Sequence, residues 1–300
     1  MTAPLFDAPK PFMAAIGTFD GVHLGHRALL GDLSRVSAEA GLRPVAVTFN
    51  HHPLEIIDPQ RAPRSLMTLG ERIDALRRTV GDVIILDFDR RMRSLSARQF
   101  MTMLRDSYQV RAIYMGFNHH FGSDRLTEFA DYQAVAGELG MSVHKGIEAE
   151  AGGHKVSSSI IRSLVAEGDM AEAALCLGRP YRLSGIVGRG HQIGRQIGFP
   201  TANIAPLDLR QAVPPSGVYA CDAVTSDGTR HRAVVNIGTR PTVASDGITT
   251  IEAHILDFDC DIYGSVLSLD FLRRIRPERR FDNSAELAAQ IARDIDEARV

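Results

Sequence analysis

The stretch GTFDGVHLGH, residues 17–26, places two glycines and two histidines where an apolar run ends and a helical pattern begins. Gly17 and Gly21 allow the backbone to turn and to approach a phosphate closely. His23 and His26 can donate hydrogen bonds to phosphoryl oxygens, and a helix start offers free N–H groups to an anion. This pattern predicts a phosphate-binding loop. The alternative is a simple βα turn with two solvated histidines.

A second candidate for phosphate binding is VSSSIIR, residues 156–162. It predicts a helix start with Ser157 or Ser158 at the cap. Arg162 would follow one turn inside, where its guanidinium can bind two phosphate oxygens at once. Without other motifs, an ordinary serine-capped helix with a surface arginine is the simpler interpretation.

The second half of the chain carries a glycine-rich stretch, GRGHQIGRQIGFPTANI, residues 188–204. Its glycines predict a flexible loop whose backbone can surround phosphates, with a nearby arginine as a charge partner. They would also suit the corners of a barrel. The residues concerned are Gly190, Gly194, Gly198 and Arg195.

Oxygen-bearing side chains follow in the same half. Thr201 and Asn203 lie two residues apart in an extended stretch, so both side chains point to one side. Their oxygens suit Mg²⁺, although a turn after Pro200 would use the same residue types. Glu252 interrupts the β-rich apolar segment TTIEAHIL, where a carboxylate must face solvent or a polar cleft. It is therefore either a solvated strand residue or part of a site.

The hydrophobic pattern predicts the elements that position these residues. Residues 12–16 and 45–49 are typical of short buried strands, and a helical repeat of apolar residues lies between them. This pattern favours a parallel β-α-β unit. The first half is therefore predicted to be a doubly wound, Rossmann-like α/β domain. Further strands are expected over 83–86 and 112–115, and further helices near 97–104 and 131–139.

After GRPY, residues 178–181, the pattern changes to alternating, β-branched segments separated by turn residues. The segments on either side of Asp227 and Gly228 predict a hairpin. A helix is expected from about residue 285. We therefore expect a small antiparallel β-barrel with a terminal helix, and a division into domains of residues 1–180 and 181–300.

Composition excludes several classes of protein. The net charge of -2 and the pI near 6.6 provide no basic field for a nucleic acid or an anionic membrane. The chain has three cysteines without a CxxC motif, no signal-peptide pattern and no apolar run long enough to span a bilayer, so we expect a cytoplasmic protein. The GxxxxGK[ST] phosphate loop is absent, so ATP would be bound by another route. The oligomeric state is open.

Together these motifs resemble those of a known enzyme family. GTFDGVHLGH is similar to the HxGH signature of the nucleotidyltransferase superfamily, and VSSSIIR is similar to its ISSTxIR element. The glycine-rich stretch, GVYA, NIGTRPT and IEAHILDF resemble the riboflavin kinase domain. In this order, and over essentially the whole chain, the motifs resemble those of the bifunctional bacterial riboflavin kinase/FAD synthetases.

The resemblance implies a transferase that makes FAD in two steps. Riboflavin and ATP would give FMN and ADP in the barrel, and FMN and a second ATP would give FAD and pyrophosphate in the α/β domain. For the kinase, it implies that Glu252 is the general base and that Thr201 and Asn203 hold Mg²⁺. Small-molecule substrates are therefore expected, and neither a nucleic acid nor a membrane partner.

For the adenylyl transfer, the resemblance implies that His23, His26 and Arg162 stabilise the developing charge. His51 and His119 replace a proline and an aromatic residue of the family pattern. The implied ATP or phosphate contacts are Gly17, Phe19, Gly21, Asn118, Ser157, Ser158, Gly190, Gly194, Arg195 and Gly198.

Two other functions stay open on the sequence. One is a nucleotidyltransferase with a different acceptor, whose β domain only binds a ligand. The other is a flavin-sensing or RNA-binding protein without catalysis, which would be expected to lack the candidate catalytic residues.

Overall fold

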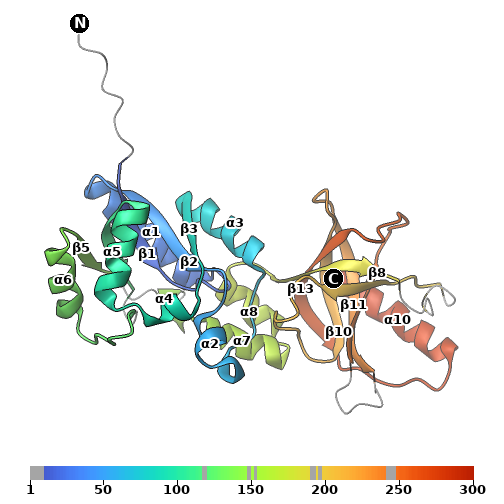
Figure 1. Ribbon diagram of the computed structural model, residues 1–300. Coiled ribbons are helices and arrows are strands. Elements are labelled where there is room, and N and C mark those ends of the chain that lie inside the picture. The colour runs from blue at the N-terminus through green and yellow to red at the C-terminus, as the bar shows by residue number, and fades with distance from the viewer. Residues whose placement is uncertain are drawn as a thin grey trace, which may run out of the picture. The chain divides into compact units, whose positions relative to one another are not determined.

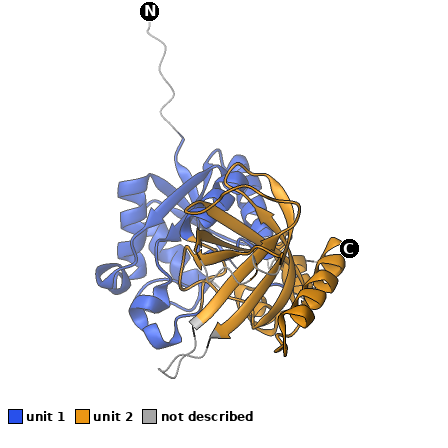
Figure 2. Ribbon diagram, turned by 90° about the vertical axis from the view of Figure 1, so that its right-hand side faces the viewer, with its two compact units in different colours: residues 1–63, 69–156 blue, residues 64–68, 157–300 orange. Residues whose placement is uncertain are grey.

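The computed structural model describes residues 10–116, 120–146, 150–151, 154–189, 194, 198–240 and 248–300. The chain divides into two compact units, coloured separately in Figure 2. Unit 1 comprises Met1–Pro63 and Leu69–Val156, and unit 2 comprises Arg64–Thr68 and Ser157–Val300. The units are defined by contacts between residues and not by activity. The boundary between the two activities, predicted between residues 180 and 181, therefore stays a prediction.

Unit 1 is built on a 5-stranded sheet in which every pair of neighbours is parallel (Figure 1). Its order is β3-β2-β1-β4-β5, with β1 (Phe12–Ile16), β2 (Arg43–Phe49), β3 (Asp82–Leu86), β4 (Val110–Met115) and β5 (Ser142–Lys145). The helices are α1 (Leu24–Glu39), α2 (Pro53–Ile57), η1 (Pro59–Arg61), α3 (Leu69–Val80), α4 (Arg90–Ser94), α5 (Ala97–Tyr108) and α6 (Phe129–Glu138). A small pair, β6 (Glu150–Ala151) and β7 (His154–Lys155), completes the unit.

Helices cover both faces of this sheet. α1 contacts α3 and α5 contacts α6, as in a doubly wound arrangement. Val45 and Val47 of β2 belong to one core cluster with Phe100 and Leu104 of α5. The predicted Rossmann-like fold is therefore confirmed. The strand order reverses between β1 and β4, and ligands of such sheets bind beyond the carboxyl ends of the strands at this point. Residues 17–26 follow β1 directly.

Unit 2 begins with α7 (Ser158–Glu167) and α8 (Met170–Leu177) and continues into a closed barrel with the order β10-β11-β12-β9-β8-β13. All six pairings are antiparallel. α10 follows the last strand, so the predicted barrel and terminal helix are confirmed. The bounds are β8 (Tyr181–Gly188), β9 (Ala202–Pro206), β10 (Gly217–Val224), β11 (Arg230–Arg240), β12 (Ile248–Ile255), β13 (Val266–Arg276) and α10 (Ser284–Arg299).

The predicted hairpin joins β10 to β11. Gly228 has a φ of 87°, which a glycine adopts without strain. The Asp227 carboxylate accepts hydrogen bonds from Thr225 Oγ1 at 2.6 Å and from the Thr229 N–H at 3.0 Å. These bonds lower the pKa of Asp227 to about 2. The turn therefore fixes the register of the two strands.

Alternation along the strands separates an inner from an outer face of the barrel. Val218, Ala220 and Val234 form a cluster with Ala298 and the partly buried Ile295 of α10. Because α10 lies outside the closed barrel (Figure 1), these strand residues point outward, as does every second neighbour on the same strand. The candidate residues of this unit lie on the outer face of the barrel, on the side that α10 covers.

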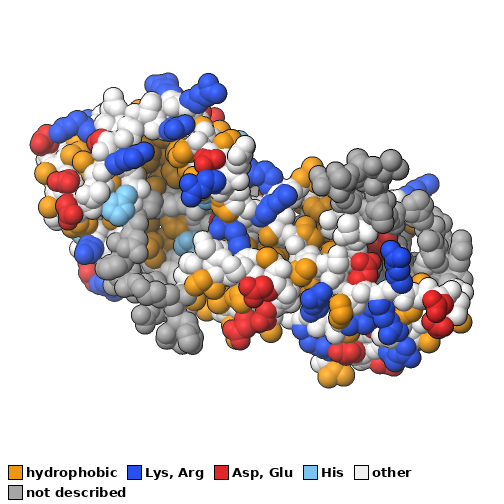
Figure 3. Space-filling model, turned by 90° about the horizontal axis from the view of Figure 1, so that it is seen from below, with side chains coloured by type: hydrophobic (Ala, Val, Ile, Leu, Met, Phe, Trp, Pro, Cys, Tyr) orange, Lys and Arg blue, Asp and Glu red, His pale blue; other side chains and the backbone are white. Residues whose placement is uncertain are grey.

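Charged side chains of the barrel are paired with one another. Asp270 is 3% exposed and accepts two hydrogen bonds from Arg182, at 2.6 and 2.8 Å, and one from Arg230 at 3.0 Å. Asp222 lies opposite Asp270 in the strand register and pairs with Arg232 at 2.9 Å. The positive charges of these arginines thus balance the negative charges of two adjacent carboxylates. On the face seen in Figure 3, basic and acidic side chains are likewise interspersed rather than gathered by sign.

The five-residue segment Arg64–Thr68 interrupts unit 1 in the sequence but packs in unit 2. Ser65 forms a parallel bridge with Gln211 and donates a side-chain hydrogen bond to Asp208 at 2.9 Å. Gln211 is 1% exposed, and its side chain donates to the Leu66 carbonyl at 3.3 Å. Leu66 itself is buried. The segment therefore contributes main-chain pairing and apolar burial to unit 2.

Candidate active sites

The loop between β1 and α1 is tightly wound. His23 is the N-cap of α1, and its Nδ1 atom accepts a hydrogen bond from the His26 N–H at 3.3 Å. Phe19 and Val22 have φ angles of 48° and 38°, and Gly21 has 85°. A left-handed conformation is uncommon for a β-branched residue, so Val22 is strained. Because Phe19 and Val22 are buried, packing holds this conformation.

The two histidines of the loop lie face to face. Their ring centroids are 3.7 Å apart, and the Phe19 ring meets His26 edge-on at 5.3 Å. Burial, and to a lesser extent His23, lowers the pKa of His26 well below 6.5, so His26 is neutral at neutral pH. His26 Nδ1 is buried and has no hydrogen-bond partner within the described part of the chain. A phosphoryl oxygen would satisfy it as the acceptor of an N–H.

A buried arginine holds the loop through a hydrogen bond to its main chain. Arg72 of α3 is 8% exposed and donates to the Thr18 carbonyl at 2.9 Å and to the Phe49 carbonyl at 2.6 Å. Thr48 Oγ1 also donates to the Thr18 carbonyl, at 3.1 Å. The sequence interpretation missed Arg72. The available signal was its spacing, because the buried residues of α3 recur every four positions, at 72, 76 and 80.

The serine-rich motif belongs to unit 2, whereas the two histidines belong to unit 1. Ser157 is the N-cap of α7, and its hydroxyl accepts from the Ile160 N–H at 3.3 Å. Of the two predicted caps, the structure therefore has Ser157, and Ser158 is the first helical residue. Arg162 lies in the second turn of α7 and donates from Nε to the Arg64 carbonyl at 2.7 Å.

Three polar residues form a row across the outer face of the barrel. Glu252 of β12 lies opposite Asn203 of β9 on one side and opposite Asn236 of β11 on the other. Directly opposed residues of antiparallel strands share a face. The strand register thus brings Glu252 next to Asn203, one of the two predicted metal ligands. Asn236 was not expected, although a polar residue within VVNIG breaks the apolar alternation as Glu252 does.

A cavity of about 350 Å³, here called the outer cavity, lies over this row. Its polar lining comprises Thr201, Asn236, Glu252, His254, Arg276, Glu278, Arg279 and Asp294. Its apolar wall comes from two barrel strands, from the segment after β13 and from α10: Val218, Val234, Phe281, Leu287 and Ile291. The outer cavity therefore combines this apolar wall with three carboxylates, Glu252, Glu278 and Asp294, and two arginines, Arg276 and Arg279.

An ion pair anchors α10 to the barrel at the outer cavity. Arg276, at the end of β13, donates to Asp294 of α10 from Nη2 at 2.7 Å and from Nε at 2.9 Å. Asp294 is 2% exposed. The guanidinium groups of Arg276 and Arg279 lie 5.8 and 4.6 Å from the centroid of the Phe281 ring. The apolar wall of the cavity is thus held by charged contacts.

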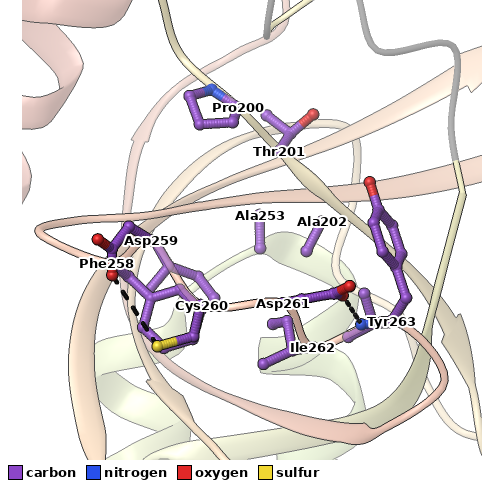
Figure 4. Close-up of a pocket in the computed structure, with 12 residues that line it drawn as sticks. Pro200, Thr201, Ala202, Ala253, Phe258, Asp259, Cys260, Asp261, Ile262 and Tyr263 are labelled. Carbon is purple, nitrogen blue, oxygen red and sulfur yellow. Dashed lines mark hydrogen bonds between the residues drawn. The ribbon is translucent and has the colours of Figure 1, made fainter.

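A second cavity, here called the end cavity, has a volume of about 470 Å³ and lies at one end of the barrel (Figure 4). Val187, Ala202 and Ala253 line it from the strands, and residues 258–263 close it. Asp261 accepts a hydrogen bond from the Tyr263 N–H at 3.0 Å, which fixes that loop. Thr201 borders both this cavity and the outer cavity. The two cavities therefore meet at Thr201.

Comparison with known proteins bears on the whole chain. A family model described as riboflavin kinase matches residues 177–300, and one described as FAD synthetase matches residues 6–160. A protein from Pseudomonas fluorescens named bifunctional riboflavin kinase/FMN adenylyltransferase is 38% identical over 96% of this chain and 92% of its own length. The chain belongs to this family. A bifunctional riboflavin kinase/FMN adenylyltransferase from Escherichia coli K12 is 39% identical, over 93% of this chain and 89% of its own length.

A solved structure is also similar to this chain. It is described as a macrolide-efflux protein from Streptococcus pneumoniae, and it matches with a TM-score of 0.85 and 31% identity over 97% of this chain and 95% of that one. No helix in the part of the chain that the structure describes is long and apolar enough to cross a membrane.

The glycine-rich stretch of this family member is described only in part. Gly194 and Gly198 are described, and the Phe199 N–H donates to the Gly194 carbonyl at 2.8 Å. A Cβ atom on Gly194 would lie 2.3 Å from the Phe199 carbonyl oxygen, so the close approach requires glycine. The predicted contacts Asn118, Gly190 and Arg195, and the departure His119, lie outside the described residues.

The fit of Mg²⁺ to the barrel follows from the donors. Thr201 offers a hard oxygen atom where the two cavities meet, and Asn203 offers another opposite Glu252 in the strand register. Mg²⁺ in phosphoryl-transfer sites takes few protein ligands because phosphates and water supply the rest. The described residues contain no group of three or more His, Cys, Asp or Glu side chains that would hold a metal by themselves. The donors thus suit a metal that arrives with a nucleotide.

Proposed function

We propose that residues 181–300 phosphorylate riboflavin to FMN and that residues 1–180 transfer an adenylyl group to FMN, with ATP as the second substrate of each step. The observation that carries the proposal is the pair of cavities that meet at Thr201, one of them containing Glu252. Incubation of the purified chain with riboflavin and Mg·ATP, followed by separation of the flavins, tests it. FMN should form first and FAD afterwards. Failure to form FMN would favour a nucleotidyltransferase with another acceptor.

In the kinase, the outer cavity would hold riboflavin and the end cavity would hold ATP. The apolar wall of the outer cavity suits the isoalloxazine ring, and Glu252 would accept the proton of the ribityl 5′-hydroxyl as that oxygen bonds to the γ-phosphorus. The bond from this phosphorus to ADP breaks, and ADP leaves. Thr201 and Asn203 would hold Mg²⁺, which supplies charge neutralisation on the phosphates when bound.

In the adenylyl transfer, a phosphate oxygen of FMN would attack the α-phosphorus of ATP and pyrophosphate would leave. No covalent enzyme intermediate is needed, because the attacking phosphate is already ionised. The half-buried, neutral His26 would donate a hydrogen bond to a phosphoryl oxygen, and His23 and Arg162 would stabilise the remaining charge. The remaining phosphate contacts proposed here are Gly17, Phe19, Gly21, Asn118, Ser157 and Ser158.

A thiol reports on the end cavity. Cys260 is exposed and borders it, whereas burial raises the pKa of Cys176 and of Cys221. We expect an uncharged alkylating reagent to modify Cys260 first. Mg·ADP at about ten times its Kd should slow this modification about tenfold, because only the free site reacts. Riboflavin alone should not slow it. Peptide mass spectrometry measures the rate, with Cys176 as the internal control, and protection by riboflavin alone would contradict the assignment.

Fragments test the division into domains of residues 1–180 and 181–300. A fragment of residues 181–300 should convert riboflavin to FMN and never to FAD. A fragment of residues 157–300 should do the same with a higher melting temperature, because α8 packs against β8 and β13. Circular dichroism and flavin separation measure both properties. A folded 181–300 fragment that binds riboflavin but makes no FMN would contradict the boundary.

We place the protein in the cytoplasm. The described cysteines Cys176, Cys221 and Cys260 are all free thiols, which suits a reducing compartment.

A further inference from the structure

His254 lies two residues after Glu252 on β12, so strand alternation places both side chains on the outer face of the barrel. β12 pairs with β9 through two positions, Glu252 with Asn203 and Ala253 with Ala202. The next position of this antiparallel register would set His254 opposite Thr201. The ladder between the two strands ends before it.

The His254 side chain continues the connection where the ladder ends. Its Nδ1 atom lies 2.8 Å from the Pro200 carbonyl oxygen, and Nδ1 carries the hydrogen because a carbonyl can only accept. The His254 ring also meets the Phe199 ring edge-on, with centroids 5.6 Å apart. The Phe199 N–H in turn donates to the Gly194 carbonyl. The residues before Thr201 are therefore held from two sides.

Holding the Pro200 carbonyl oxygen also orients Thr201. The atoms of a peptide group are coplanar, so a hydrogen bond that fixes the oxygen of Pro200 fixes the plane that contains N and Cα of Thr201. Thr201 borders both cavities, whereas His254 borders only the outer one of the two. His254 can thus influence the end cavity only through the segment that it holds.

We propose that His254 is a positioning residue of the kinase, which holds Thr201 at the junction of the two cavities through its hydrogen bond to Pro200. The inference rests on the proposed assignment of the end cavity to the nucleotide. It predicts that loss of this one donor weakens nucleotide binding while riboflavin binding and adenylyl transfer are unchanged.

Three variants separate the hydrogen bond from the volume of the ring. His254→Leu removes the donor. His254→Asn keeps a nitrogen donor at the same number of bonds from Cβ as Nδ1, and His254→Gln moves that donor one bond farther. We expect His254→Leu and His254→Gln to raise the Mg·ADP concentration that half-protects Cys260 from alkylation by about threefold to tenfold, the effect of one lost hydrogen bond. In His254→Asn, this half-protecting concentration of Mg·ADP should equal that of the original protein.

Steady-state kinetics complete the test. The KM for Mg·ATP in FMN formation should rise with the half-protecting concentration, and the KM for riboflavin should stay constant. FAD formation from added FMN by the same preparations, together with the melting temperature, controls for folding. If Mg·ADP protects Cys260 equally well in the original protein and in all three variants, the inference is wrong. A changed KM for riboflavin with an unchanged KM for Mg·ATP would also overturn it, because His254 would then contact the flavin directly. If Mg·ADP fails to protect even the unmodified protein, the nucleotide assignment itself fails.

Discussion

Replacing Glu252 with glutamine should lower the turnover of riboflavin phosphorylation by about 10²- to 10⁴-fold, because glutamine keeps the shape of the side chain but cannot accept the proton of the hydroxyl. FAD formation from added FMN should stay at its original rate, since an ionised phosphate needs no base. One preparation of Glu252→Gln therefore receives riboflavin in one assay and FMN in the other. Riboflavin binding, measured by fluorescence quenching, should change little.

A second carboxylate provides the matched control for Glu252. Glu278 also borders the outer cavity but lies on the exposed segment after β13, outside the row formed by Asn203, Glu252 and Asn236. Glu278→Gln should leave kinase turnover within about threefold of the original, as expected where no proton is transferred. If Glu252→Gln and Glu278→Gln had the same small effect, Glu252 would not be the base.

Replacing His26 with alanine should lower FAD formation from FMN by about 10²- to 10³-fold, the usual loss for one preorganised donor. FMN formation from riboflavin should stay near its original rate, because the kinase residues lie in unit 2. His144→Ala is the matched control in unit 1, since His144 lies on β5 and contacts Ser142 rather than the loop. Equal loss of both activities in His26→Ala would point to unfolding or to a site shared by the two reactions.

The depressed pKa of His26 has a consequence for stability. The unfolded chain binds a proton at this histidine near pH 6.5, whereas the folded chain does not, because burial disfavours the imidazolium. The free energy of unfolding should therefore fall as the pH drops below 6.5, by up to about 1.4 kcal/mol per pH unit from this residue. His26→Ala should remove this part of the acid sensitivity. Urea unfolding of both proteins between pH 7.5 and pH 5.5 measures the difference.

Local patterns predicted the elements of the fold well. β1 spans the predicted residues 12–16, and the Asp227-Gly228 turn joins the predicted strands. Such features depend on neighbours in the sequence. The chemistry of the flavin was inferred from the resemblance to a family, because the hydrophobic periodicity of a sequence carries no information about the substrate.

Contacts between distant segments were not predictable in the same way. The register that sets Asn203 beside Glu252 and Asn236 follows from barrel closure, and the single sequence carries no signal for it. Arg72 was missed because an arginine is expected at the surface. In the structure its buried guanidinium group donates hydrogen bonds to two main-chain carbonyls, which replace the water it would bind at the surface. The structure places His23 and His26 face to face, which their three-residue spacing at a helix start allows but does not require.

The membership of residues 64–68 in unit 2 has a consequence during protein synthesis. Ser65 and its partner Asp208 are 143 residues apart in the chain. At about 5 to 20 residues per second, roughly 7 to 29 s pass between their appearance at the ribosome. Leu66 and Met67 are buried in the finished protein, and Gln211, whose side chain donates to the Leu66 carbonyl, is made only after Asp208. The nascent chain therefore presents a short apolar segment that a chaperone can bind until the barrel is made.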